Sequence, residues 1–91
     1  MLRGVITVDL GPHLESDGSA GVKAENAAWS VLAATPTGWA VNVDLGAATW
    51  VTDRLLVILQ DGLHEAAGVQ VTGQNAAAVH AVLQRLRENA W

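Results

Sequence analysis

The chain has 91 residues, no cysteine and a formal net charge of −4 at pH 7. A chain of this length buries enough surface for a core of its own, so we expect residues 1–91 to form a single domain. Without cysteine, a disulfide framework, a thiolate metal site and a cysteine nucleophile are excluded. The few basic side chains form no stripe that would follow a nucleic-acid backbone. They are Arg3, Lys23, Arg54, Arg85 and Arg87.

No segment has the character of a membrane span or of a secretory signal. The longest uninterrupted apolar run, Leu55 to Leu59, is far shorter than the roughly 20 residues that cross a bilayer. The N-terminus lacks the charged segment and following apolar stretch of a signal peptide. We therefore expect a cytoplasmic protein without membrane insertion.

The first third of the sequence predicts a strand, a loop and a helix. Residues 4–10 are rich in β-branched side chains, and residues 11–19 are polar and prone to turns. Residues 20–34 are rich in alanine and end before Pro36, which predicts a helix. Its larger apolar residues recur near helical spacing, so we expect Trp29 to lie in the core. These residues are Val22, Trp29, Leu32 and Ala33.

Residues 39–45 predict a second strand, because apolar and smaller or polar side chains alternate along it. Trp39, Val41, Val43 and Leu45 share one side, while Ala40, Asn42 and Asp44 share the other. One face of this strand is therefore expected to be buried, with Trp39 among the core residues.

Two further helices and a short strand complete the pattern. Thr52 can cap a helix from 53 to about 67, in which Gly62 is an interior exception that costs roughly 1 kcal/mol. Residues 68–72 predict a third strand, and Asn75 can cap the last helix. The apolar stripes of the two helices are Leu55, Leu56, Leu59, Leu63 and Ala66, and then Val79, Val82, Leu83 and Leu86.

Strand and helix alternate three times, which predicts an α/β fold with a mostly parallel sheet and right-handed crossovers. Strands laid down in chain order place every crossover helix on the same face of the sheet. The alternation in residues 39–45 agrees, because a strand covered on both faces would be continuously apolar. No internal repeat and no low-complexity segment is identified.

The run VDLGAATWVTDRLLVIL at residues 43–59, followed by GVQVTGQN at residues 68–75, resembles the STAS domain. This family comprises bacterial anti-sigma-factor antagonists, stressosome proteins and sulfate-transporter tails. The resemblance covers about residues 38–87. It is carried by Asp44, Leu45, Trp50, Val51, Leu56, Leu59, Gly73, Gln74 and Asn75.

The resemblance implies a small STAS-like β-α superhelix and a non-catalytic bacterial signalling module. Such a module would regulate transcription as an anti-sigma-factor antagonist, binding an anti-sigma factor or kinase-like protein. A stressosome-type partner or a subunit of a transport complex is the alternative that the same resemblance leaves open.

The sequence departs from the family at the start of the helix that follows residue 51. Thr52 stands where the family has Asp, Asp53 stands where it has a phosphorylatable Ser, and Leu55 replaces a Gly. Asp53 is then either a helix-stabilising acid or a permanent negative charge that locks the module in one binding state. Thr52 is either the helix cap or a candidate phosphosite.

We expect a partner-binding surface at the loop 46–51 and the helix start at 52–56. Trp50 is either a core residue or a contact for the partner, because exposed tryptophans often anchor interfaces. The predicted contact residues are Trp50, Thr52, Asp53, Arg54 and Leu56.

Two other functions compete with this prediction. Asp9, Asp44 and Asp53 lie near strand ends or a helix start, where α/β proteins bind ligands, and together they would hold Mg²⁺ or accept a phosphoryl group. Alternatively, the chain is a structural subunit that forms a homodimer through the uncovered sheet face. The histidines, His13, His64 and His80, lack the spacing of a metal site. No lysine, serine nucleophile or glycine-rich phosphate loop accompanies the three aspartates, so we predict no enzymatic activity, no cofactor and no resident metal.

Overall fold

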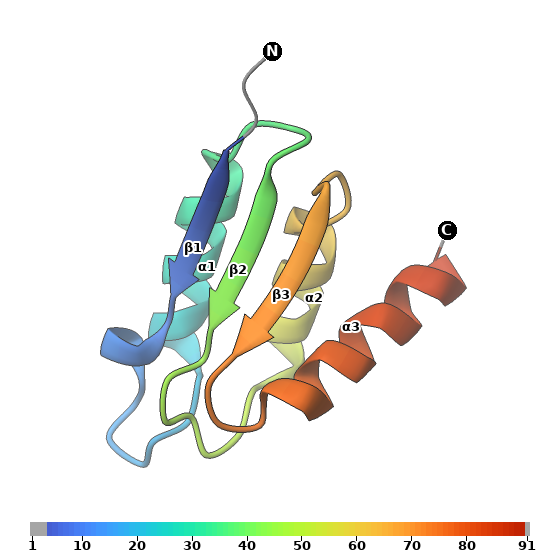
Figure 1. Cartoon of the computed structure of the whole chain (residues 1–91). Coiled ribbons are helices and arrows are strands. Elements are labelled where there is room, and N and C mark those ends of the chain that lie inside the picture. The colour runs from blue at the N-terminus through green and yellow to red at the C-terminus, as the bar shows by residue number, and fades with distance from the viewer. Residues whose placement is uncertain (1–3, 91) are drawn as a thin grey trace.

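The computed structural model describes residues 4–90, with side chains through residue 85 (Figure 1). Strands and helices alternate as the sequence predicts, with one short 3₁₀ helix, η1, after the first strand. In chain order they are β1 (Val5–Asp9), η1 (Gly11–His13), α1 (Val22–Ala33), β2 (Ala40–Asp44), α2 (Asp53–Gly62), β3 (Gly68–Thr72) and α3 (Ala76–Ala90). The predicted side-chain position of Leu86 and the terminal Trp91 lie outside the described part.

The three strands form one parallel sheet in the order β1-β2-β3. The strands are in register without a stagger, so that Asp9, Asp44 and Thr72 share one row at their carboxyl ends. The predicted α/β class and parallel arrangement are confirmed.

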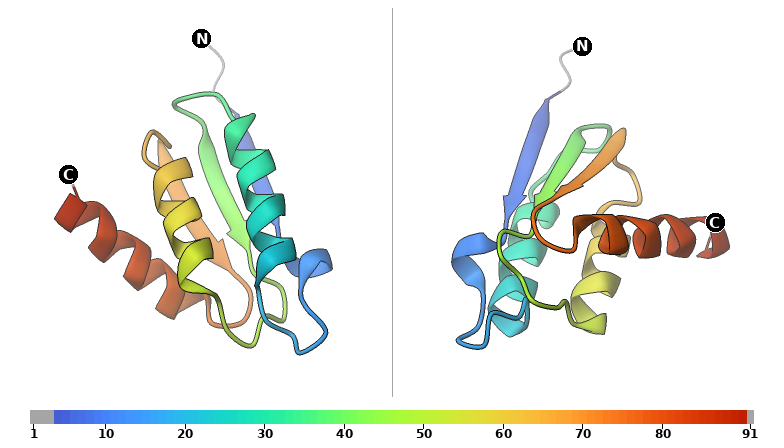
Figure 2. Two further views of the ribbon diagram at one scale, coloured as in Figure 1. Left: turned by 180° about the vertical axis from the view of Figure 1, so that it is seen from behind. Right: turned by 60° about the horizontal axis from the view of Figure 1, so that its bottom comes forward.

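The helices lie on one side of the sheet. In Figure 1, α1 and α2 lie side by side behind the strands; in the left view of Figure 2, seen from behind, they lie in front of the strands, and α3 leaves the β3 edge on the same side. Val8 and Val43 point toward the helices and are buried, whereas Thr7 and Asn42 lie on the opposite face. The opposite face is free of helices within residues 4–90, because each crossover returns over the same side.

The prediction that Trp29 is a core residue of α1 is wrong. Its side chain is 64% exposed, and Val22 at the helix start is 65% exposed. The buried stripe consists of Ala24, Ala28 and Leu32, which recur at every fourth position. Small alanines let the helix approach the sheet closely, and an indole at the same place would hold it away. Trp29 and Val22 therefore face outward, and Leu32 is the one large apolar side chain of the buried stripe.

Helix α2 is shorter than predicted, because it ends at Gly62 and not near residue 67. Gly62 is thus its last residue, and Leu63 follows as a fully buried cap whose N–H donates to the Leu59 carbonyl. A helix of 10 residues is about 15 Å long and matches a strand of 5 residues, about 16 Å long. A longer helix would carry the chain past the start of β3.

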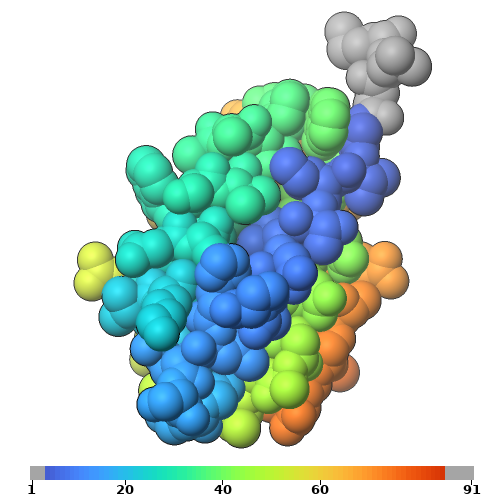
Figure 3. Space-filling model, turned by 90° about the vertical axis from the view of Figure 1, so that its left-hand side faces the viewer, coloured from blue at the N-terminus to red at the C-terminus, as the bar shows by residue number. Residues whose placement is uncertain are grey.

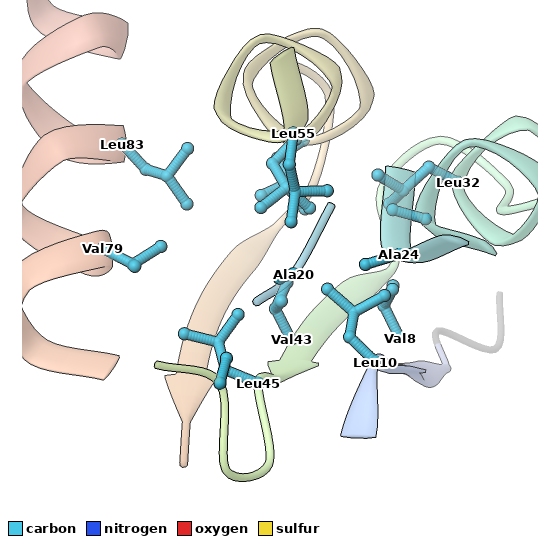
Figure 4. Packing of buried hydrophobic residues seen from close by; sticks show 14 of the residues in the cluster. Val8, Leu10, Ala20, Ala24, Leu32, Val43, Leu45, Leu55, Val79 and Leu83 are labelled. Carbon is cyan, nitrogen blue, oxygen red and sulfur yellow. The ribbon is translucent and has the colours of Figure 1, made fainter. Parts of the chain in front are cut away.

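The core lies between the sheet and the helices, and all three helices contribute to it (Figure 4). Leu55 and Leu59 of α2 occupy its middle, fully buried. Val79 and Leu83 of α3 close it at the β3 side and point toward α2 in Figure 4. Among residues 4–90, no helix combines the length and the apolar character that a membrane crossing needs.

A short sequence repeat, which the sequence analysis did not identify, shapes the carboxyl ends of the first two strands. Val-Asp-Leu-Gly occurs at residues 8–11 and again at 43–46. In both copies the Asp Oδ1 accepts the Gly N–H two residues later, from Gly11 at 3.2 Å and from Gly46 at 2.9 Å. Each Asp thereby turns the chain sharply at the end of its strand. The repeat therefore forms the same turn twice, after β1 and after β2, at the carboxyl edge of the sheet.

Candidate partner-binding site

The loop between β2 and α2 presents Trp50 at the carboxyl edge of the sheet, where 53% of the side chain is exposed. The open question about Trp50 is therefore answered: it is a surface residue and not part of the core. Its surroundings decide whether it can serve as an anchor.

The backbone of Trp50 is held from the α1 side. Ala20 N–H donates to the Trp50 carbonyl at 2.9 Å, and Thr52 N–H donates to the Ala20 carbonyl at 3.3 Å. These bonds form an isolated parallel bridge between Ala20 and Val51. The segment between β1 and α1 is thus paired with the β2–α2 loop through this single bridge.

The same loop is itself ordered by a local turn. Asp17 Oδ1 accepts the Ser19 N–H at 2.9 Å, and hydrogen bonds from Ser19 lower the pKa of Asp17. Thr49 N–H donates to the Gly18 carbonyl at 2.9 Å. Figure 3 shows this loop in blue, continuous with β1 and with the start of α1. The residue before Trp50 is therefore fixed as well.

From the α3 side, the loop is held by Asn75. The sequence predicts that Asn75 caps α3, but its side-chain amide donates to the carbonyls of Ala48 at 2.9 Å and Thr49 at 3.2 Å. Gln74 N–H adds a bond to the Gly46 carbonyl at 2.8 Å. Asn75 adopts a left-handed conformation, with φ 65°, which asparagine tolerates better than most residues. It is a cross-link between two loops.

Thr52 is the N-cap of α2, as predicted. Its Oγ1 accepts the Leu55 N–H at 3.2 Å and donates to Glu25 Oε2 at 2.6 Å. Glu25 comes from α1 and is only 7% exposed. Phosphorylation of Thr52 would remove the proton that it donates to Glu25 and place a charge of about −2 against this carboxylate.

We expect Thr52→Ala to lower the free energy of unfolding by about 1–2 kcal/mol, because it removes the cap and leaves Glu25 without its hydroxyl donor. Thr52→Ser keeps both hydrogen bonds and should stay within about 0.5 kcal/mol of the wild type. Urea denaturation of the three proteins measures the difference. Equal losses for the two variants would show that the hydroxyl contributes nothing.

The structure divides the five predicted contact residues between two sides of α2. Arg54 leans toward α1, where its Nε lies 3.8 Å from Glu25 Oε1, although its side chain is 82% exposed. Trp50 and Leu56 lie on the other side, toward α3. Asp53 is exposed in the first turn of α2, where an acid suits the helix dipole. One continuous patch of Trp50 and Arg54 is therefore not formed.

Beside Trp50 lies an open hollow of about 250 Å³ between the β2–α2 loop and α3. Its walls are mainly apolar, and Val82 of α3, which is 37% exposed, forms the wall opposite the loop. We call this feature the Trp50 hollow. It is lined by Thr49, Trp50, Val51, Leu56, Asn75, Ala78, Val79 and Val82.

The three aspartates of the competing ligand site do not come together. Asp9 and Asp44 are neighbours across β1 and β2, and each is engaged in its own turn with a glycine. Asp53 belongs to the start of α2 and joins neither of them. In the part of the chain that the structure describes, no three or more His, Asp or Glu side chains gather as metal ligands would.

Sequence reasoning missed Glu25 and the linking role of Asn75. Glu25 shares the buried stripe of α1 with Ala28 and Leu32, at spacings of three and seven residues. An acid within such a stripe is a signal of a buried partner, which here is Thr52. The partners of Asn75 are distant in sequence and leave no comparable pattern.

A scan of this chain with protein-family models gives no match, and comparisons with curated proteins and with solved structures give none.

Proposed function

We propose that this protein is a non-catalytic interaction module of the STAS type, and that its protein partner docks on Trp50 and the Trp50 hollow. The observation that carries the proposal is an exposed indole on a backbone that is fixed from both sides. Ala20 holds the Trp50 carbonyl, and Asn75 holds the two residues before it in the loop.

A rigid backbone supports binding because less conformational freedom is lost when the partner docks. Tryptophan adds a large contact area and is enriched at the energetic centres of interfaces. An apolar side chain of the partner that enters the hollow would contact Val82 and Leu56 as well as the indole. The partner surface that fits this site is therefore a projecting apolar side chain with a polar surround.

The class of partner follows from the resemblance to anti-sigma-factor antagonists. In this proposal the partner is an anti-sigma factor or kinase-like regulator, with a subunit of a transport complex as the alternative. Asp53 supplies a constant negative charge close to the docking surface. The hydrogen bond from Thr52 to Glu25 supports a structural role for Thr52, so the proposed module does not switch by phosphorylation.

Trp50→Ala is expected to weaken partner binding at least tenfold, which corresponds to about 1.4 kcal/mol, because the indole is the central contact. Its melting temperature should stay within a few degrees of the wild type, since the indole is mostly outside the core. Partners are first captured from cells that make the protein and identified by mass spectrometry. The purified partner is then titrated calorimetrically against each variant.

Trp29→Ala is the matched control, because Trp29 is another tryptophan that is more than half exposed, on a different surface. It should retain the partner affinity of the wild type within about twofold, a change of about 0.4 kcal/mol. Equal affinities of wild type and Trp50→Ala would overturn the proposed docking site. Capture of a small ligand or Mg²⁺ in place of a protein would favour the competing function.

A further inference from the structure

A cavity of about 310 Å³ opens at the amino edge of the sheet, between the α1–β2 loop and the α2–β3 loop. Both loops lie at the top of Figure 1, whereas the β2–α2 loop, which carries Trp50, lies at the bottom. Among the residues that line the cavity, Leu32 and Val41 are buried and Trp39 is half-buried. We call this site the amino-edge cavity. It is independent of the proposed function, because it lies at the opposite edge of the sheet from Trp50.

Three hydrogen bonds tie the two loops together, so the amino-edge cavity is preformed. Gly38 N–H donates to the Glu65 carbonyl at 3.0 Å, and Ala67 N–H donates to the Trp39 carbonyl at 3.0 Å. Thr37 Oγ1 donates to Glu65 Oε2 at 2.8 Å. Preformed cavities that combine apolar side chains with a few polar groups are the usual sites of small molecules, and their volumes start at about 300 Å³. This cavity therefore has the size and the rigidity of a small-molecule site.

The carboxylates at the cavity have no basic side chain beside them. Asp61 in the last turn of α2 and Glu65 in the following loop both line it, and both side chains are exposed. Within residues 4–85, no lysine or arginine lines the cavity. The basic side chains of this part of the chain lie at the starts of α1 and α2 or on α3. They are Lys23, Arg54 and Arg85.

The ends of two helices add to the negative potential at the cavity. Each crossover helix runs from the carboxyl edge of the sheet back to the amino edge, so α1 ends at Ala33 and α2 ends at Gly62. A helix C-terminus carries a partial negative charge, which favours a cation nearby. His64 is the one described lining residue that can carry a positive charge, and histidines are generally neutral at about pH 8. The site therefore favours a cation over an anion.

We propose that the amino-edge cavity binds a small organic cation, an ammonium compound with an apolar body. The apolar body packs against Trp39 and Leu32, and the ammonium group contacts the carboxylates of Asp61 and Glu65. An indole suits such a ligand, because it offers apolar surface and also attracts cations to its ring face. Both carboxylates are exposed, so solvent screens part of the attraction and the affinity is modest.

The probe is 2-phenylethylammonium, titrated at about pH 8 into the ¹⁵N-labelled protein and followed by NMR. We expect saturable binding with a dissociation constant on the order of 1 mM, and the largest shifts at the Trp39 indole N–H and the amides of residues 61–66. The neutral isostere 2-phenylethanol should bind at least tenfold more weakly. Equal binding of the alcohol, the largest shifts at Trp50, or no saturation up to about 10 mM probe would overturn the proposal.

Two substitutions test whether the carboxylates recognise the charge. Asp61→Asn and Glu65→Gln should each raise the dissociation constant of the probe about threefold, and the double variant should raise it about tenfold. Both side chains are exposed, so circular dichroism should show unchanged folding. Asp53→Asn is the matched control, because it removes the same charge from the other end of α2, and it should stay within about twofold. A double variant that binds as tightly as the wild type, or an equal loss in Asp53→Asn, would show that these carboxylates do not hold the cation.

Discussion

Gly73→Ala is expected to lower the free energy of unfolding by about 2–5 kcal/mol, a large part of the stability of a small domain. Gly73 has φ 97°, a conformation that costs other residues about 1–2 kcal/mol. A Cβ there would lie 2.7 Å from the Gly46 nitrogen and 2.8 Å from its carbonyl oxygen. Both are backbone atoms, so relief requires the loops to move apart, at a further cost of about 1–3 kcal/mol.

The loops that would move are those that hold Trp50. Gly46 accepts the hydrogen bond from Gln74, and Asn75 follows directly. We therefore expect Gly73→Ala to weaken partner binding as well, even in the fraction that remains folded. Gly68→Ala is the control, because a Cβ at Gly68 meets no atom within 4 Å. Urea denaturation showing equal stability for the two variants would contradict the close approach of the loops.

Gly62→Ala is expected to lower the free energy of unfolding by about 1–3 kcal/mol, through overpacking against α1. A Cβ at Gly62 would lie 2.8 Å from Leu32 Cβ and 2.5 Å from Leu32 Cδ1. Helix propensity alone predicts the opposite sign, a gain of at most roughly 1 kcal/mol from replacing glycine by alanine, because Gly62 is the last residue of α2. The sign of the measured change thus separates the local effect from the tertiary one.

A double-mutant cycle with Leu32→Ala completes this test. The single change Leu32→Ala should cost about 2–5 kcal/mol, because Leu32 belongs to the core. In that background the contacts with Leu32 Cγ and Cδ1 are gone and only the Cβ contact at 2.8 Å remains, so Gly62→Ala should cost clearly less than in the wild type. An equal destabilisation by Gly62→Ala in both backgrounds would show that the Leu32 side chain beyond Cβ is not its cause.

The candidate site was predicted in part from local sequence. Thr52 as the helix cap follows from its hydroxyl and its position before an apolar stripe, both of which are properties of neighbouring residues. The sequence did not predict that Trp50 and Arg54 lie on different sides of α2, because this depends on which helices flank α2. Glu25 and Asn75 secure the site from residues that are 27 positions from Thr52 and Ala48, respectively.

The sequence by itself determined the order of strands and helices and the parallel direction of the sheet. These depend on hydrophobic period, turn residues and the right-handed crossover, which are local rules. Only the tertiary structure decided which side of α1 is buried. The period of α1 allowed two apolar stripes, one through Trp29 and one through Ala28. The close approach of helix and sheet selected the small side chains, and it thereby left Trp29 exposed on the surface.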